Sequence, residues 1–214
     1  MVIKQKNLFI SSACSYPKDF TIFSGSERLQ HLRETINSCK RIDDSINVIS
    51  EGSHISDEEK SMFNDSIVFT YKNDKTIEWA TQTKQLGTPM LWLAALQNIE
   101  VANDTNIFFL SGRYQLLPEF KTKDFTGDYS FKKHWYVEGR GGWYGTQLYK
   151  ISGRVKIEYE YVLQECINRL LDGTAQDIEC AIYQSLTTRG IIPTELESVH
   201  CVGLLGPNGK KEKH

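Results

Sequence analysis

The stretch Ile107-Phe108-Phe109-Leu110-Ser111-Gly112-Arg113-Tyr114 decides the fold class of this 214-residue chain. Its first four residues are apolar on both faces, which is typical of a strand in the middle of a sheet that is covered on both sides. The apolar run ends abruptly at a polar turn. Because ligands of open α/β sheets collect at the carboxyl ends of the strands, Ser111, Gly112, Arg113 and Tyr114 are candidate binding residues.

The residues before this stretch alternate between apolar runs and segments with helical spacing. Strands are expected over residues 7–13, 46–50 and 67–71. One helix is expected after a cap at Ser26, a short one after the capping box Ser56-Asp57-Glu58-Glu59, and another with Pro89 in its first turn. This order predicts a single-domain α/β fold with a mixed, mainly parallel central sheet flanked by helices.

The rest of the chain changes character. Residues 125–152 are rich in aromatic residues and glycine, which predicts strands with a mobile connection around Gly139-Arg140-Gly141-Gly142. Helices are expected over 157–171 and 177–186, and a last strand over 199–204. One domain is predicted over residues 1–209. The charged residues 210–214 are interpreted as a solvated tail or as the start of a linker to further C-terminal domains.

Composition excludes several classes of partner. A formal net charge of −2 with 24% charged residues gives no reason to expect a nucleic-acid partner. The start shows no cleavable signal pattern, and the sequence has no apolar run of about 18 residues, so no membrane span is expected. Five scattered cysteines without a Cys-x-x-Cys pair indicate buried free thiols in a reducing compartment. These features predict a cytoplasmic location.

Several common catalytic motifs are missing from the sequence. It contains no Walker phosphate loop, no Gly-x-Gly-x-x-Gly after the first strand, no Gly-x-Ser-x-Gly elbow and no His-Glu-x-x-His. Kinases, dinucleotide dehydrogenases and serine hydrolases are therefore disfavoured. What remains is an α/β beginning typical of nucleotide-binding domains, joined to the turn at 111–114.

A family resemblance builds on that turn. The run Phe109 to Tyr114, preceded by Lys84-Gln85-Leu86-Gly87, resembles the paired motifs of small A-type-fold glycosyltransferases that build capsular or viral glycans. Asp177-Ile178-Glu179 and the closing Val202-Gly203-Leu204-Leu205-Gly206 are similar to the end of that family. Length and composition also resemble the N-terminal domain of chlorella-virus capsid-glycan glycosyltransferases, which would place the chain in the host cytoplasm.

The resemblance implies transfer of a sugar from a nucleotide diphosphate donor, a UDP-sugar, to a hydroxyl of a glycan acceptor. It also implies a divalent cation, Mn²⁺ or Mg²⁺. The family usually carries an Asp-x-Asp for this ion, and this sequence has none. Either Ser111 and Arg113 replace it or the ion is bound differently. By the same resemblance His200 would be a metal ligand, although a lone histidine is also compatible with a structural role.

Further donor-site residues follow from analogy with the fold. Ser11, Ser12 and Ala13 after the first strand and Glu51 after the second would hold the nucleobase and ribose. Tyr71 and Lys84 are candidates for the same pocket, and Gly203 would allow the backbone to approach a phosphate closely. Arg113 could hold a phosphate or a sugar hydroxyl, or tie the sheet together.

The candidate catalytic residues are Asp177 and Glu179. An inverting transferase needs a carboxylate to remove the proton of the acceptor hydroxyl, whereas a retaining one does not. The helix dipole alone also favours acidic residues in a first turn. A further expectation is that aromatic residues grip the acceptor from a mobile loop, or else belong to the core of a hairpin. These residues are Trp135, Tyr136, Trp143 and Tyr144.

Two other functions stay open on the sequence alone. One is a catalytically silent module that binds a nucleotide or a carbohydrate, which the missing Asp-x-Asp allows. The other is a nucleotidyltransferase on a related sheet.

Overall fold

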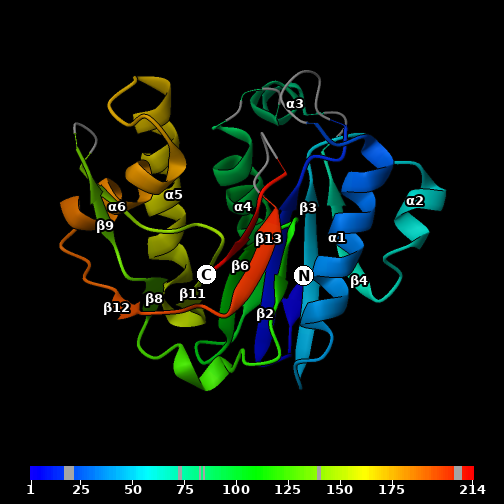
Figure 1. The fold of residues 1–214 in the computed structure, drawn as a ribbon, viewed down its shortest axis with the longest axis horizontal. Coiled ribbons are helices and arrows are strands. Elements are labelled where there is room, and N and C mark those ends of the chain that lie inside the picture. Colours follow the sequence, from blue (N-terminus) through cyan, green and yellow to red (C-terminus); the bar gives the residue numbers. More distant parts are fainter. Residues whose placement is uncertain (17–21, 72–73, 82, 84, 139–140, 205–208) are drawn as a thin grey trace.

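The computed structural model describes residues 1–16, 22–71, 74–81, 83, 85–138, 141–204 and 209–214. A seven-stranded sheet in the order β12-β8-β11-β6-β2-β3-β4 forms its centre (Figure 1). Only β11 runs opposite to its sheet neighbours. The strands are β2 (Asn7–Ala13), β3 (Ser45–Glu51), β4 (Ser66–Thr70), β6 (Asn106–Ser111), β8 (Tyr129–Lys132), β11 (Leu148–Ser152) and β12 (Thr194–Leu196).

The middle of this sheet is buried on both faces, as the apolar run predicts. Successive side chains of a strand point to opposite faces. On β6, Ile107 and Phe109 therefore enter one core cluster while Phe108 and Leu110 enter another. On β2 the neighbour Phe9 stacks on Phe108 with ring centroids 4.9 Å apart. The β2–β6 register fixes which residues meet at the carboxyl ends of the two strands.

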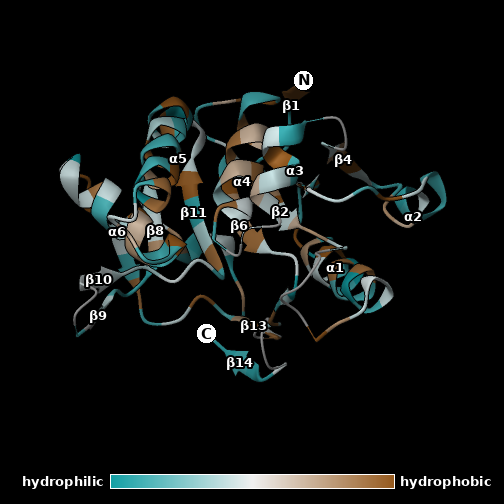
Figure 2. Ribbon diagram, turned by 90° about the horizontal axis from the view of Figure 1, so that it is seen from above, coloured by the Kyte–Doolittle hydropathy of each residue, from teal (hydrophilic) through white to brown (hydrophobic). Residues whose placement is uncertain are grey.

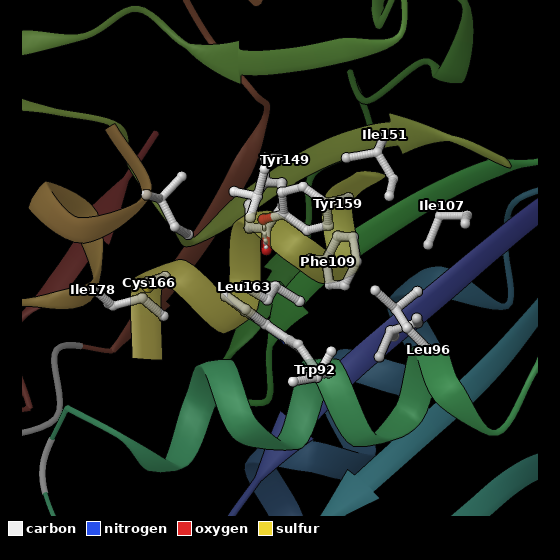
Figure 3. Close-up of a cluster of buried hydrophobic side chains, with 14 of the residues drawn as sticks. Trp92, Leu96, Ile107, Phe109, Tyr149, Ile151, Tyr159, Leu163, Cys166 and Ile178 are labelled. Atoms are coloured by element: carbon white, nitrogen blue, oxygen red, sulfur yellow. Dashed lines mark hydrogen bonds between the residues drawn. The ribbon is translucent and has the colours of Figure 1, made fainter. Parts of the chain in front are cut away.

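Helices cover one face of the sheet. These are α4 (Gly87–Gln97), α5 (Lys156–Leu171) and α6 (Ile178–Thr188), with α3 (Lys75–Thr81) beside α4. The core beneath them is aromatic: Trp92 of α4 meets Phe109 and Tyr149 edge to face, with ring centroids 5.4 and 5.3 Å away (Figure 3). Tyr159 of α5 donates its hydroxyl hydrogen to Tyr149 over 2.8 Å, so the buried hydroxyls are partnered within the core.

The other face carries α1 (Gly25–Cys39) and a three-stranded sheet (Figure 2). The strand order of this small sheet is β14 (Lys211–Lys213), β13 (Cys201–Leu204) and β7 (Tyr114–Leu116). It brings the last residues of the chain to the strand that follows the 111–113 turn. Lys211–Lys213 therefore belong to a sheet rather than to the solvated tail expected for 210–214, because they complete the hydrogen bonds of β13.

The remaining elements are short. A hairpin is formed by β9 (Trp135–Val137) and β10 (Gly141–Trp143), and β1 (Val2–Ile3) pairs with β5 (Glu100–Val101). The short helix α2 (Asp57–Ser61) follows β3, and two 3-10 turns, η1 (Thr122–Asp124) and η2 (Gly153–Val155), lie near β8 and α5. In the described residues no helix is long and apolar enough to cross a membrane.

The predicted fold class is confirmed, with local differences. The cap of α1 is Ser24 and not Ser26, because Glu27 lies three residues after Ser24 and completes a reciprocal capping box with it. The box from Ser56 to Glu59 is confirmed. Strands β7, β12 and β14 and helix α3 were not predicted. Each is short, and β7 and β12 pair with strands that lie far away in the chain.

Candidate functional site

The turn after β6 lies at the carboxyl ends of two central strands. Ser12 of β2 is in register with Ser111, and Ala13 is in register with Glu51 of β3. The amide of Gly112 donates to the carbonyl oxygen of Ser12 over 3.2 Å, and the amide of Ser111 donates to the carbonyl of Gln147 over 3.2 Å. The turn is therefore held from both sides by backbone hydrogen bonds.

Two glycines allow close packing around this turn. A Cβ on Gly112 would come within 3.0 Å of the Ser12 carbonyl oxygen and 3.2 Å of the Leu32 side chain. A Cβ on Gly203 would lie 2.4 Å from the Tyr114 ring and 2.6 Å from the Arg113 carbonyl oxygen. These positions explain why the sequence places glycine there: β13 could not approach β7 so closely otherwise.

A pocket of about 200 Å³ opens between the ends of β2 and β6 and the start of α4. It brings together five of the predicted site residues: Ser12, Ala13, Ser111, Gly112 and Arg113. The other lining residues in the described part of the chain are Cys14, Ser15, Arg28, Thr81, Thr83, Gly87, Thr88 and Leu91. We call this the β2–β6 pocket.

The charged side chains on this lining, within the described residues, are two arginines. Burial and the nearby charge of Arg28 lower the pKa of Arg113 to about 10, so the guanidinium stays protonated at neutral pH. Arg28 donates its Nε hydrogen to the Cys14 carbonyl oxygen over 2.7 Å. Burial raises the pKa of the Cys14 thiol, which disfavours a thiolate nucleophile there. The pocket is thus electropositive.

Arg113 also lines a second hollow, of about 460 Å³, on the α1 side. Gly203, Gln115, His31 and Glu34 are among the residues that surround it. Burial lowers the pKa of His31, and the charges of Arg113 and Arg28 act in the same direction while Glu34 opposes them. Arg113 therefore borders both hollows.

Glu51 lies behind the pocket and does not line it. Its carboxylate is fully buried and accepts hydrogen bonds from the Ser15 amide, the Ser15 hydroxyl and the Ser53 amide at 3.0, 2.7 and 2.8 Å. Burial raises the pKa of Glu51, and these hydrogen bonds act in the opposite direction. Through these hydrogen bonds Glu51 fixes the loop after β2, and its side chain does not line the pocket.

Two further candidates among the described residues, Ser11 and Tyr71, do not line the pocket. Ser11 is fully buried in β2, one residue before the pocket lining. Tyr71 follows β4 and is half-buried, and burial raises its pKa. Lys84 lies outside the described residues. The contribution of Tyr71 to a ligand site stays a prediction.

The structure places His200 away from the Arg113 turn. Gly203 pairs with Tyr114, whereas His200 precedes β13, and its carbonyl oxygen accepts from the Leu117 amide at the opposite end of β7. His200 lies three residues before Gly203 in the chain, which corresponds to about 10 Å along an extended strand. In the described part of the chain no group of three or more His, Cys, Asp or Glu side chains could hold a metal ion.

The two carboxylates proposed for catalysis have different surroundings. Asp177 is the N-cap of α6, and its Oδ1 accepts from the Cys180 amide over 2.9 Å, which gives it a structural task. Glu179 accepts a hydrogen bond from the Thr146 hydroxyl over 2.8 Å. Burial raises the pKa of Glu179. Thr146 precedes Gln147, whose carbonyl oxygen accepts a hydrogen bond from the Ser111 amide. Glu179 therefore lies near the start of β11, but it does not line the β2–β6 pocket.

The aromatic residues form the expected hairpin. Trp135 pairs with Trp143 across it, and their ring centroids are 5.9 Å apart. Tyr144 is buried, whereas Tyr136 is 71% exposed and its hydroxyl lies 3.0 Å from that of Tyr183 on α6. Tyr144, which follows β10, therefore belongs to the core, whereas Tyr136 and Trp135 lie on the surface.

Sequence reasoning missed the part of the pocket contributed by helices. Arg28 lies in the first turns of α1, and Thr88 lies in the first turn of α4. For Thr88 the sequence signal was the helix start at Thr88-Pro89, because the free backbone amides at a helix N-terminus can bind an anion. Arg28 gave no local signal, because its nearness to Arg113 arises from the packing of α1 against β7.

The sheet order, with its single reversed strand β11, gives a mainly parallel α/β fold with a pocket at the carboxyl ends of the strands. Solved structures of the A-type glycosyltransferase fold share this architecture. Glycosyltransferase GlyE from Streptococcus pneumoniae TIGR4 matches with a TM-score of 0.58 at 10% identity, over 91% of this chain and 46% of that one. Galactosyltransferase LgtC, solved with donor and acceptor sugar analogs, matches with a TM-score of 0.54 at 9% identity, over 84% and 70% of the two chains.

A putative nucleotide-diphospho-sugar transferase from Desulfovibrio desulfuricans G20 gives a TM-score of 0.51 at 9% identity, over 90% of this chain and 80% of that one. The present chain spans about half the length of GlyE. No protein-family model matches the sequence, and the search of curated proteins gave no match. At these identities the likeness establishes the fold. The narrower resemblance to chlorella-virus enzymes stays a prediction.

Proposed function

We propose that this chain is a glycosyltransferase that moves a sugar from a nucleotide diphosphate donor, a UDP-sugar, to a hydroxyl of a glycan acceptor. The observation that carries the proposal is the electropositive β2–β6 pocket at the carboxyl ends of the central strands. In α/β sheets this is where nucleotides bind. The fold shared with GlyE and LgtC supports the same reading.

The donor would lie with its diphosphate beside Arg113 and the turn that contains Ser111 and Gly112. Ser12 and Ala13 would contact the nucleoside at the end of β2. A planar guanidinium can donate two parallel hydrogen bonds to phosphate oxygens, which orients the diphosphate as well as attracting it. Thr88 at the start of α4 would add backbone amides and the positive end of the helix dipole.

In the transfer step the bond between the anomeric carbon and the phosphate oxygen breaks, and its electron pair stays on that oxygen. A new bond forms between the anomeric carbon and the acceptor oxygen, whose proton passes to a base. Donors that meet the phosphate oxygen stabilise the charge that develops there. If the configuration inverts, we assign the base to Glu179, because Asp177 is occupied as a helix cap.

Thermal unfolding with nucleotides tests the proposal directly. A ligand that binds only the folded state raises the melting temperature. UDP and UDP-sugars should therefore stabilise the chain more than GDP or CDP at equal concentration. No stabilisation by any nucleotide, with or without Mn²⁺, would show that the proposed function is wrong.

A second experiment separates a transferase from a silent nucleotide-binding module, which the carboxylate-free turn keeps as the alternative. UDP-sugars are incubated with the chain, and release of UDP is followed by chromatography with and without glycan acceptors. Slow release without acceptor and faster release with it identifies a transferase. Binding without release identifies the silent module.

A further inference from the structure

The metal ion implied by the fold family does not fit the residues of the β2–β6 pocket. Hard divalent cations bind oxygen ligands and above all carboxylates. Within the described residues, the pocket lining holds no Asp, Glu or His side chain, and its charged members are Arg28 and Arg113. The carboxylate of Glu51, behind the pocket, is fully buried and accepts hydrogen bonds from Ser15 and Ser53.

Arg113 stands where the family pattern would supply a carboxylate. The backbone on both sides of it is fixed, because the Gly112 amide donates to the Ser12 carbonyl oxygen and the Leu204 amide donates to the Arg113 carbonyl oxygen. In the described part of the chain, its side chain makes no hydrogen bond and no ion pair within 4.0 Å. A half-buried guanidinium without an anion is a costly arrangement unless a ligand completes it.

The start of α4 adds a second positive element to the same pocket. Gly87 and Thr88 line it, and the N-cap residue Leu86 offers no side chain to the first amides of the helix. The first turn also lacks acidic residues. Unfilled amides at a helix N-terminus favour an anion, and here they share a pocket with Arg113.

Resting on the proposed function, we infer that Arg113 itself neutralises the diphosphate of the donor, so that nucleotide binding in this chain needs no divalent cation. Arg113 would donate its guanidinium hydrogens to the phosphate oxygens, with the α4 amides on the other side. Both positive groups are part of the protein and stay in place between turnovers. Binding should then depend on ionic strength and not on added metal.

Titration calorimetry of the purified chain with UDP tests the inference in EDTA and in MnCl₂. We expect dissociation constants that agree within about threefold in the two buffers, a difference of less than 1 kcal/mol at 25 °C. Binding seen only with Mn²⁺ would overturn the inference and leave the proposed function intact. Binding in neither buffer would overturn the proposed function together with it.

A variant pair then tests the assignment to Arg113. Arg113→Gln should weaken UDP about tenfold to a hundredfold in EDTA, the loss expected for a hydrogen bond between charged groups. Uridine, which has no phosphate, should be unaffected. The control is Arg33→Gln, on the exposed side of α1, which should leave UDP binding unchanged. Equal UDP affinity for Arg113→Gln and wild type would overturn the assignment.

Two further measurements test the inference even if Arg113→Gln does not fold. If Arg113→Gln loses its cooperative unfolding transition, Arg113→Lys takes its place: it keeps the charge but not the forked donors, and it should bind UDP more weakly than wild type in EDTA. In addition, wild-type affinity for UDP in EDTA should fall steadily as NaCl is raised, while affinity for uridine stays constant. A salt-independent UDP affinity would contradict a charge-based site.

Discussion

Gly112 donates its amide hydrogen to the carbonyl oxygen of Ser12, and this 3.2 Å bond joins the turn after β6 to the end of β2. Ser12 belongs to β2 and Gly112 follows β6, far away in the chain, yet both line the β2–β6 pocket. The bond fixes the backbone next to Arg113 against the end of β2, at the edge of the pocket. Changes at this contact should therefore affect stability and ligand binding together.

Gly112→Ala is the first prediction. The new Cβ would lie 3.0 Å from the Ser12 carbonyl oxygen, which is backbone and cannot rotate away. We expect a loss of about 1–3 kcal/mol in the free energy of unfolding, and weaker UDP binding. Urea denaturation and calorimetry measure the two effects. The matched control is Gly145→Ala, whose Cβ would approach chiefly the movable end of the Gln147 side chain; an equal loss there would contradict a specific role for the turn.

The second prediction concerns the hydrogen bond between two buried tyrosines. Tyr159 donates its hydroxyl hydrogen to the Tyr149 hydroxyl, and both side chains are fully buried. Tyr159→Phe leaves a buried hydroxyl on Tyr149 without this donor and should cost about 1–3 kcal/mol. The double replacement of both tyrosines by Phe should cost less than the sum of the single changes, because no orphaned hydroxyl remains. Strict additivity in thermal or urea unfolding would contradict this account.

The fold could be predicted largely because the central strands are recognisable from short stretches of sequence. Apolar residues at Phe108 and Phe109 indicated a strand buried on both faces, and the alternation of strands and helices indicated a parallel sheet. The sequence also contains the signal for the cap at Ser24, because Glu27 follows it at the spacing of a capping box. The prediction of Ser26 as the cap did not use this spacing. Local signals were sufficient for the central strands of the main sheet but not for its short edge strand β12.

The site was only partly readable, because its other half comes from distant packing. Ser12, Ala13, Ser111, Gly112 and Arg113 were predicted from the ends of strands, and the structure brings them together. Arg28 lies on a helix and meets the pocket through tertiary packing, which no local pattern encodes. Likewise, the position of His200 follows from the register in which β13 pairs with β14 and β7. A local sequence motif contains no information on this register.

Glu179→Gln is the third prediction. Burial raises the pKa of Glu179, so the protonated carboxyl is favoured in the folded state. This group stabilises the fold below its ordinary pKa of 4.5, and that contribution is lost as the pH rises through the raised value. At neutral pH the Gln variant, which can still accept from Thr146, should be at least as stable as wild type. Its unfolding free energy should also vary less with pH over that interval.

The same variant tests catalysis separately from stability. A base must be ionised, so wild-type transfer should fall as the pH drops below the raised pKa of Glu179, and Glu179→Gln should lose about 100-fold or more in kcat while UDP affinity is retained. Glu58→Gln, at an exposed position on α2, is the control for removing a carboxylate. Unchanged turnover in the Glu179 variant would remove this residue from the mechanism and would favour retention of configuration.

The fourth prediction places the acceptor at the β9–β10 hairpin. Tyr136 is 71% exposed there, next to Trp135 at 38%, and neither residue lines the β2–β6 pocket. Sugars pack well on such aromatic faces. Tyr136→Ala should therefore raise the KM for the glycan acceptor about three- to tenfold, the loss of a contact worth about 1 kcal/mol, and leave the UDP dissociation constant unchanged. Steady-state kinetics with varied acceptor, alongside UDP titration, separate the two effects.

The matched control is Tyr161→Ala, because Tyr161 is 61% exposed on α5 and lies on a different element. A structural effect of losing a surface tyrosine would change both variants alike, whereas an acceptor contact would change only the hairpin variant. Tyr136→Phe sharpens the distinction further, since it removes the 3.0 Å contact between the Tyr136 and Tyr183 hydroxyls but keeps the ring. If ring stacking carries the affinity, Tyr136→Phe should keep a KM near that of wild type; a KM as high as that of Tyr136→Ala would assign the effect to the hydroxyl pair and to the position of the hairpin on α6.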